Sequence, residues 1–302
     1  GQLVLDARQH DVEVRPVDIN ASDWDCTLEG TVAEWQSGKV AECGDSLCHS
    51  ATLQLCHSSS GPQPSPHCWA LRLGLRMVRG LAERHALLIV RERGDRPFAS
   101  FADFTRRTQL SNAVLKTLAQ ADAYGSLRLN RRTALWQSLP AQRQLPLFQD
   151  LPDEDIPAAL PALTLREQVA DDYHSAGLSL RGHPLQFVRP RLERRGIVAA
   201  CDLAHLPADR HYKVAGLVLL RQRPGTAKGI TFVTIEDETG PANLIIRQEI
   251  WERYRRIAST ATAFVAHGHL QRAEGVIHLL VDRLQDLTRL LSDVDARSRD
   301  FR

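Results

Sequence analysis

Three consecutive carboxylates offer the first candidate chemistry in this sequence. Glu236, Asp237 and Glu238 are followed by Thr239 and Gly240. Carboxylate oxygens are the ligands that hard divalent cations prefer. Successive residues of a tight turn point in different directions, however, and such side chains usually stay in water. We therefore interpret the segment as a solvated acidic turn between strands and predict no bound metal there.

Zinc-ligand residue types also gather between residues 43 and 68. The group consists of Cys43, Cys48, His49, Cys56, His57, His67 and Cys68. None of the spacings forms the Cys-x-x-Cys knuckle of a structural zinc site, and a polar insertion without a ligand explains the composition equally well. Cys26 and Cys201 lie apart and are interpreted as plain thiols. Because no nucleophile, base and orienting group can be assembled elsewhere, we predict no catalytic residue, metal or cofactor in this segment.

The distribution of arginine favours phosphate binding instead. Residues 70–135 carry 13 basic and 5 acidic side chains, whereas residues 1–69 carry 3 and 10. Only four of the 38 basic residues are lysine, so an arginine-rich composition is the alternative explanation. Such a composition raises the arginine count everywhere without concentrating it. The cluster therefore predicts a polyanionic partner, nucleic acid.

Two glycine turns lie within this basic stretch. Gly80 stands in the segment 77–81 before a helical pattern at 82–93, and Gly125 stands in the segment 123–127. Both have the form of a helix-hairpin-helix, in which free amides at a helix start bind phosphate oxygens. An ordinary helix C-cap would also place a glycine there. The predicted contacts are Arg72, Arg76, Arg79, Gly80, Arg84, Gly125, Arg128, Arg131 and Arg132.

The periodicity of apolar residues divides the chain into helical and strand regions. Residues 2–10 are expected to be helical, 12–17 a short strand and 70–139 a set of short helices. A capping-box pair, Thr164 and Glu167, predicts another helix from about residue 164. The expected later elements are strands at 214–220, 230–235 and 242–246, a helix at 248–258, and strands at 263–270 and 276–281. Three strands, a helix and two strands is the order of an OB-fold barrel.

The first loop of the expected barrel supplies a second set of candidate nucleic-acid contacts. OB-folds contact single strands with basic and aromatic groups from this loop and the neighbouring strands. The predicted contacts are Arg221, Arg223, Lys228, Phe232, Arg247 and Arg272. The alternative is that Phe232 belongs to the core and that the arginines only make the barrel soluble.

A short peptide in the proline-rich, acidic segment 140–161 is a candidate for protein binding. Gln144, Leu145, Pro146, Leu147 and Phe148 present a polar anchor followed by Leu and Phe, as an extended peptide does to a hydrophobic pocket. The peptide resembles the pentapeptide with which polymerases bind the sliding clamp. Five residues match easily by chance, and Leu147 with Phe148 would equally attach this linker to a neighbouring domain.

Composition and pattern together predict an α+β multidomain chain. No run of about eighteen apolar residues and no signal-peptide pattern is present, so we expect no membrane span and a cytoplasmic protein. Gly1 is followed at once by helix-like residues, which predicts a piece of a longer protein. We expect a small helix-hairpin-helix region, a linker and a C-terminal OB-fold β-barrel.

Several segments resemble bacterial error-prone DNA polymerases, which are relatives of the polymerase III alpha subunit. The matching segments are 14–17, 22–26, 176–185, the run from Arg221 through Gly240 to Asn243, and 298–302. Residues 30–69 align with no part of that family's pattern, and Arg247 stands where an aromatic residue is usual.

The resemblance implies a domain order and a function. Residues 1–29 would end a fingers-like domain, and 30–69 would be an irregular insertion. A tandem helix-hairpin-helix region would occupy 70–139, a linker 140–161, a helical connector 162–208, an OB domain 209–290 and a tail 291–302. The implied activity is DNA-directed DNA polymerisation in damage-induced mutagenesis, DNA repair and translesion synthesis, with DNA, the sliding clamp and mutagenesis accessory proteins as partners. The magnesium-binding palm carboxylates would precede residue 1, so this segment is expected to be inactive alone.

Two other functions remain open from the residues. The chain could be a free-standing single-strand-binding accessory protein with an OB-fold. The barrel could instead bind RNA, like the anticodon-binding domains of some tRNA synthetases.

Overall fold

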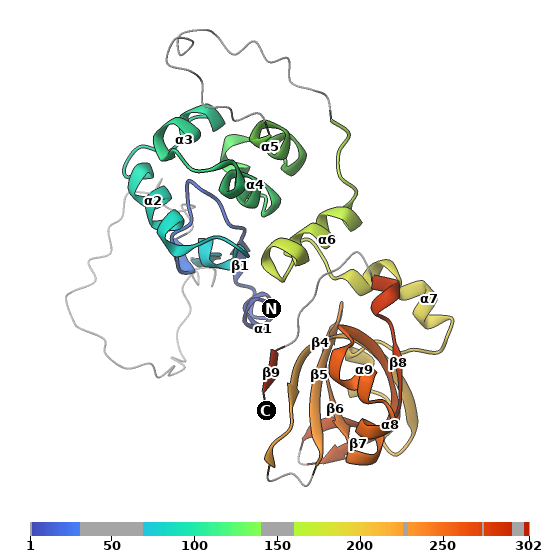
Figure 1. The fold of residues 1–302 in the computed structure, drawn as a ribbon. Coiled ribbons are helices and arrows are strands. Elements are labelled where there is room, and N and C mark those ends of the chain that lie inside the picture. Colours follow the sequence, from blue (N-terminus) through green and yellow to red (C-terminus); the bar gives the residue numbers. More distant parts are fainter. Residues whose placement is uncertain are drawn as a thin grey trace, which may run out of the picture.

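The computed structural model describes residues 2–30, 69–139, 160–225, 229–273, 275–291 and 299–301. A helical region at the N-terminal side and a β-barrel at the C-terminal side are joined by a connector that begins with α6 (Figure 1). The predicted α+β architecture, with a helix-hairpin-helix region before an OB-fold barrel, is confirmed. None of the helices in the described ranges combines the length and apolarity that a membrane crossing requires.

The chain begins with a helix and a small sheet. Helix α1 spans Gln2–Gln9, and strands β1 (Glu13–Arg15), β2 (Thr27–Gly30) and β3 (Trp69–Arg72) form a sheet in the order β1-β3-β2. β3 runs parallel to β1 and antiparallel to β2. The sequence pattern predicted α1 and β1 but neither β2 nor β3.

Four short helices pack around one apolar core. They are α2 (Glu83–Arg93), α3 (Phe101–Thr108), α4 (Asn112–Gln120) and α5 (Arg131–Ser138). Side-chain caps begin two of them: Ser100 accepts from the backbone N–H of residue 103, and Asn130 from that of residue 133. Tyr124 is fully buried at the centre, edge-on to the rings of Phe101 and Phe104. This core fixes the turns between the helices.

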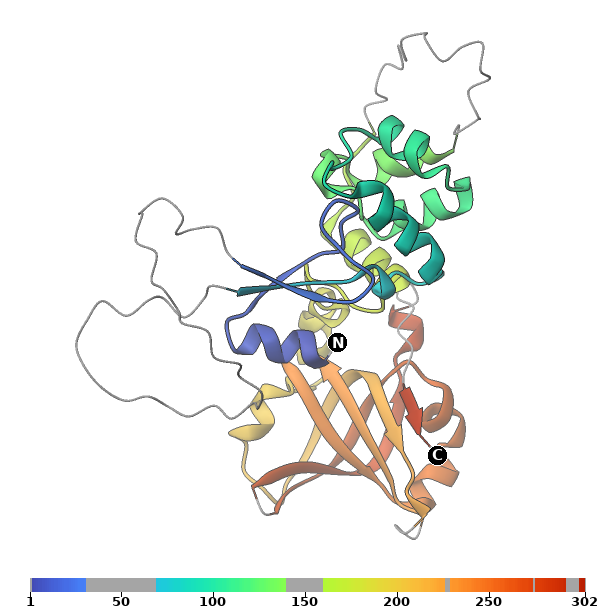
Figure 2. The ribbon, with the colours of Figure 1, turned by 90° about the vertical axis from the view of Figure 1, so that its left-hand side faces the viewer.

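A connector runs from the helical region to the barrel. Its first helix, α6 (Leu165–Ala176), has the predicted capping box, in which Thr164 and Glu167 each bind the other's backbone N–H. The connector continues through a 3-10 turn (Pro184–Phe187), α7 (Arg189–Glu193) and a second 3-10 turn (Cys201–Ala204). Figure 2 shows α6 and α7 between the upper helices and the barrel.

The barrel has the predicted order of elements. Its strands are β4 (His211–Gln222), β5 (Thr231–Asp237), β6 (Gly240–Ile246), β7 (Ala263–Ala273) and β8 (Val276–Asp286), with α8 (Gln248–Arg253) and α9 (Arg255–Thr260) between β6 and β7. The sheet order is β5-β6-β8-β7-β4, and pairing of β4 with β5 closes it. A further short strand, β9 (Arg299–Phe301), pairs in parallel with the end of β4.

Alternation along the strands sends apolar side chains into the barrel. On β5 and β6 every second residue is buried, among them Val233, Ile235, Leu244 and Ile246. The intervening residues therefore point outward, where they are available to a ligand.

Candidate nucleic-acid interface

The first glycine turn has the backbone that only glycine adopts readily. Gly80 has φ +82° and open space around its Cα, and α2 begins three residues later. The turn is preceded by β3 and a 3-10 turn (Leu75–Met77), however, and not by the helix that a helix-hairpin-helix requires. The prediction of a complete hairpin at this position was wrong, because the first element of the pair is a strand and a tight turn.

The second predicted turn does lie between two helices. α4 and α5 pack together, and residues 121–130 connect them. The positive φ angles fall at Asp122 (+57°) and Arg128 (+58°), and not at Gly125, which begins a 3-10 turn. A further helix pair, α3 and α4, is joined through Gln109, which also has a positive φ. The second predicted turn therefore lies between two helices as expected, and its positive φ angles stand at Asp122 and Arg128 instead of at the glycine.

Several arginines predicted at this interface are engaged inside the protein. Arg131 is 4% exposed and pairs with Asp172, while its Nη1 donates to the carbonyl of Gln168 at 3.1 Å. Arg72 donates to both carboxylate oxygens of Glu29, at 2.7 and 2.9 Å, and these hydrogen bonds hold the pKa of Glu29 below its usual range. Neither charge faces solvent freely, so we correct the prediction and leave both out of the interface.

Three further predicted arginines have partners within the protein and remain at least partly exposed to solvent. The Arg79 guanidinium donates to the carbonyl of His174 at 3.3 Å. Arg132 donates to the carbonyl of residue 161 at 2.8 Å, and the exposed Arg76 pairs with Asp25. Such side chains hold elements together first and have less freedom to meet a phosphate.

Arg84 and Arg128 remain as exposed predicted cations of the helical region that form no ion pair with the described residues. Arg84 lies in the first turn of α2, next to Gly80, and Arg128 lies in the turn between α4 and α5. The two cations therefore mark both turns that the sequence singled out, and a backbone phosphate is the ligand suited to them.

On the barrel, an aromatic and apolar row crosses three strands. Phe232 of β5 is 37% exposed and pairs across the sheet with Ile245 of β6, which in turn pairs with Leu280 of β8. Ile245 and Leu280 are half-buried. The Phe232 ring on this face of an OB-fold is suited to stacking with a nucleobase, and Ile245 and Leu280 continue the apolar surface beside it.

Sequence reasoning found only the first member of this row. The signal for the others was present, because Ile245 stands between inward-facing Leu244 and Ile246, and Leu280 between inward-facing Leu279 and Val281. An unbroken apolar run in a half-buried strand places apolar side chains on its outer face as well.

The first barrel loop is held against α8. The Arg223 guanidinium lies 5.8 Å from the ring centre of Trp251, at the distance of a cation–π contact. Gly229 has φ +82°, and a Cβ there would collide with the side chain of Gln248. Arg247 is exposed and occupies the N-cap position of α8 without a side-chain hydrogen bond to the helix. Arg223 and Arg247 are therefore the exposed cations close to this loop, while Lys228 lies outside the described residues.

Two other predicted barrel arginines have structural roles. Arg221 is 5% exposed, and its Nε donates to the carbonyl of Ala258 at 2.7 Å. Arg272 donates to the carbonyls of Ala204 and Leu206 at 2.5 and 2.8 Å. The first ties β4 to α9 and the second ties β7 to the connector, so we remove both from the predicted contact set.

The acidic turn is not solvated, which corrects the interpretation given above. The Asp237 side chain is fully buried and accepts from Arg189 at 2.7 Å and from the backbone N–H groups of Ala200 and Thr239, both at 2.8 Å. Glu238 pairs with the same arginine. A buried carboxylate requires such partners, so this turn anchors the connector to β5 and β6.

The described part of the chain contains no group of three or more His, Cys, Asp or Glu residues suited to a metal ion. A cavity of about 470 Å³ lies between the segment 16–21, the turn after α4 and the end of α6. Its carboxylates already accept hydrogen bonds: Asp18 from two backbone N–H groups, and Asp122 and Asp172 from Arg181. The Cys and His group at 43–68 and the peptide with Gln144, Leu145, Leu147 and Phe148 lie outside the described residues.

Comparison with protein-family models supports both halves of this arrangement. A model described as a helix-hairpin-helix motif matches residues 11–134. A second model, described as an OB-fold nucleic acid binding domain, matches residues 212–287.

Curated proteins match the chain along its whole length. An error-prone DNA polymerase of Rhodopirellula baltica is 42% identical over 100% of this chain and 24% of its own length. One from Pseudomonas syringae pv. syringae is 40% identical over 99% of this chain and 26% of its own length. The chain thus spans about a quarter of these relatives. Among solved structures, asparaginyl-tRNA synthetase from Pyrococcus horikoshii is 19% identical over 30% of this chain and 23% of its own, with a TM-score of 0.26.

Proposed function

We propose, from the premise that this chain is homologous to about a quarter of an error-prone DNA polymerase, that it is the DNA-binding C-terminal part of such an enzyme. A helix-hairpin-helix region followed by an OB-fold domain fits the C-terminal portion of that family. In this proposal the parent enzyme copies damaged template in translesion synthesis. The chain holds template and primer DNA for it.

One observation carries the proposal: two modules that both suit DNA lie in one chain that matches error-prone polymerases throughout. The turns near Arg84 and Arg128 offer cations to a duplex backbone without reading its sequence. Phe232 offers a stacking surface to unpaired bases, and Ile245 and Leu280 offer apolar contact beside it. A free-standing accessory protein is not favoured, because whole-length identity of 40% to a polymerase segment is then unexplained.

Binding of a labelled single-stranded DNA oligonucleotide tests the barrel face. We expect Phe232→Ala to weaken binding by about 1–3 kcal/mol, because one stacking surface is lost. Trp136→Ala removes another exposed aromatic side chain, outside the barrel, and is expected to bind like the unchanged chain. Equal affinity of the Phe232→Ala variant and the unchanged chain would contradict the proposed face. Preferential competition by RNA over DNA would support the RNA-binding alternative instead.

Nucleotidyl transfer is assigned in this proposal to the parent enzyme and not to this segment. Polymerases of this kind need carboxylates that hold two magnesium ions for phosphoryl transfer. We expect the purified 302-residue chain, supplied with magnesium, primer-template and nucleotides, to bind DNA and to extend no primer. Primer extension by this chain would refute that assignment.

The proposed partners beyond DNA are the sliding clamp and mutagenesis accessory proteins, in the cytoplasm. Support for the clamp comes from the peptide Gln144 to Phe148 alone. If it binds the clamp, Leu147→Ala together with Phe148→Ala abolishes the interaction in a pull-down with purified clamp. Undiminished capture of that double variant would reject it.

A further inference from the structure

Helix α6 touches both modules of the molecule. Figure 1 shows α6 between the helical region and the barrel. Val169 is fully buried and Tyr173 is 8% exposed, and both belong to an apolar core that includes Ala215, Leu217 and Val265 of the barrel strands. One face of α6 therefore packs against the barrel strands β4 and β7.

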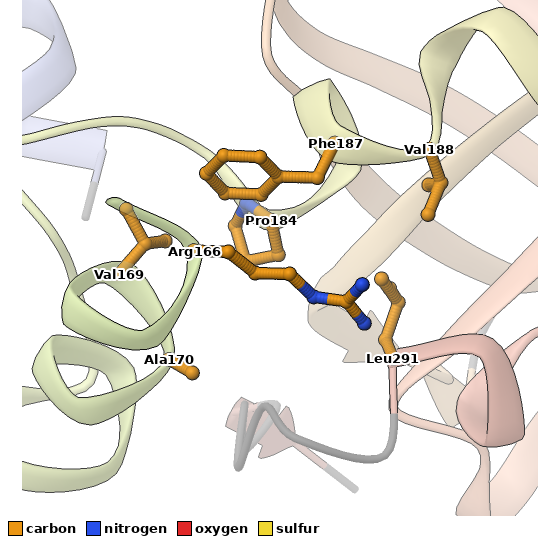
Figure 3. Close-up of a pocket in the computed structure, with 7 residues that line it drawn as sticks. All are labelled: Arg166, Val169, Ala170, Pro184, Phe187, Val188 and Leu291. Carbon is orange, nitrogen blue, oxygen red and sulfur yellow. The ribbon is translucent and has the colours of Figure 1, made fainter. Parts of the chain in front are cut away.

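The packing on this side is close. Figure 3 shows Pro184 and Phe187 beside Val169 of α6, with Arg166 extending toward Leu291. The space left among these residues is about 10 Å³, which is at the lower limit for one water molecule. Because no ligand fits there, the contact serves to hold α6 in place.

The other face of α6 carries a buried carboxylate. Asp172 is 7% exposed and pairs with Arg131 of α5. It also accepts from Arg181 Nη1 at 2.9 Å with each of its oxygens, and from Ser179 Oγ at 2.7 Å. Arg181 in turn pairs with Asp122. We call Asp122, Arg131, Asp172 and Arg181 the Asp172 network.

The Asp172 network reaches the turn that presents Arg128. Asp122 and Arg128 both lie in the connection between α4 and α5, and both have the positive φ that shapes it. A second attachment lies at the end of α6, where the backbone N–H of Arg79 donates to the carbonyl of Ser175 at 2.7 Å. Both glycine-turn regions are thus tied to the same helix.

At the barrel, the connector is attached to β5 and β6, the strands that carry Phe232 and Ile245. Arg189 pairs with Asp237 and Glu238 in the turn between β5 and β6. The backbone N–H of Cys201 donates to Thr239 Oγ1 of that turn at 3.1 Å. Contacts therefore run without a break from the Arg128 turn through α6 and the connector to the strands of Phe232 and Ile245.

We infer that Asp172 is a positioning residue that holds the α4–α5 turn and the β5–β6 face at one fixed separation, so that both bind a single duplex–single-strand junction as one bivalent surface. The inference rests on the proposed DNA-binding function. Joining two sites rigidly raises the affinity for a ligand that spans both, without any new contact, and leaves the affinity of each site unchanged. Asp172 touches no DNA in this arrangement.

Three labelled DNAs test the inference: a short duplex, a short single strand and a junction of the two. We expect the unchanged chain to bind the junction at least about tenfold more tightly than either arm. We expect Asp172→Asn to lose most of that advantage and to bind each arm within about twofold of the unchanged chain. Uniform weakening on all three DNAs would show a merely structural role and would overturn the inference.

A milder variant keeps the test decisive if Asp172→Asn does not fold. Arg181→Gln removes the link to Asp122 and leaves the Arg131–Asp172 pair in place. The matched control is Arg15→Gln, which removes an arginine paired with Glu13 and Glu29 in the N-terminal sheet.

The outcomes separate this inference from the proposed function. We expect Arg181→Gln to lose junction preference and Arg15→Gln to keep it. Retained preference in Arg181→Gln, or a junction bound no better than its arms by the unchanged chain, would overturn the coupling alone. Failure of the unchanged chain to bind either arm would instead overturn the proposed function.

Discussion

Arg128 and Arg131 stand three positions apart in one basic stretch, yet the structure gives them opposite environments. Arg128 is exposed in a turn, whereas Arg131 is 4% exposed and paired with Asp172, 41 residues away. The sequence predicted that arginines gather here and that nucleic acid is the partner. It did not predict which guanidinium is paired inside the protein, because the carboxylates that pair with it come close only when the chain folds.

His183 gives a pH dependence that is specific to one residue. It is buried beside Tyr173, and the backbone N–H of Leu185 donates to its Nδ1, so the neutral ring carries its proton on Nε2. The pKa of His183 is lowered from 6.5 to about 4, mainly by burial, with Asp237 opposing the shift and Arg189 adding to it. The folded protein therefore holds this ring neutral.

The sign of the effect follows from which state takes up the proton. Above pH 6.5 the His183 ring is neutral in both the folded and the unfolded protein, and its contribution to the free energy of unfolding is fully present. As pH falls from 6.5 to about 4, the unfolded chain binds the proton first, and stability falls by about 3 kcal/mol from this group. Urea unfolding at several pH values in this range measures the effect. The free energy of unfolding of His183→Gln should change less with pH than that of the unchanged chain. The exposed His205→Gln is the control, and an identical slope for all three proteins would contradict this assignment.

At the scale of elements, local signals that need no distant partner were predicted well. The capping box of α6 was visible from Thr164 and Glu167, and the five barrel strands were visible from their period of two. Strands β2 and β3 were missed, because three or four residues carry little periodicity and their pairing joins segments far apart in the chain. The buried acidic turn was misread for the same reason, since its partner Arg189 lies 48 residues from Asp237.

The capping box supplies a prediction for α6. Thr164 Oγ1 accepts from the N–H of Glu167 at 3.3 Å, and the Thr164 N–H donates to the Glu167 carboxylate at 2.8 Å, which holds the pKa of Glu167 below its usual range. We expect Thr164→Ala to lower the free energy of unfolding by about 1 kcal/mol. Ser111→Ala is the matched control, because Ser111 caps α4 without a side-chain hydrogen bond. Equal losses in the two variants, measured by urea unfolding, would mean that the box stabilises nothing.

The order of the modules was predictable at the scale of the whole molecule, and their attachment was not. The change of period from helical to alternating near residue 213 indicated a helical part followed by a barrel. How the two are joined depends on contacts between residues remote in sequence, such as Arg181 with Asp122 and Arg189 with Glu238. These contacts attach the connector to both the helical region and the barrel.

The salt dependence of DNA binding shows whether the exposed arginines hold a phosphodiester backbone. A labelled duplex with a single-stranded overhang is titrated with the unchanged chain, with the double variant Arg128→Ala and Arg223→Ala, and with Arg91→Ala as a control, at several salt concentrations. Arg91 is also exposed, but its charge is paired with Glu92 at 3.0 Å.

We expect the logarithm of the affinity to fall linearly with the logarithm of the salt concentration. Each lost phosphate contact should lower the slope by about 0.7–0.9, so the double variant should be shallower by roughly 1.5, while the control keeps the slope of the unchanged chain. Affinity that does not respond to salt, or one slope shared by all three proteins, would contradict the claim that these exposed arginines hold a phosphodiester backbone.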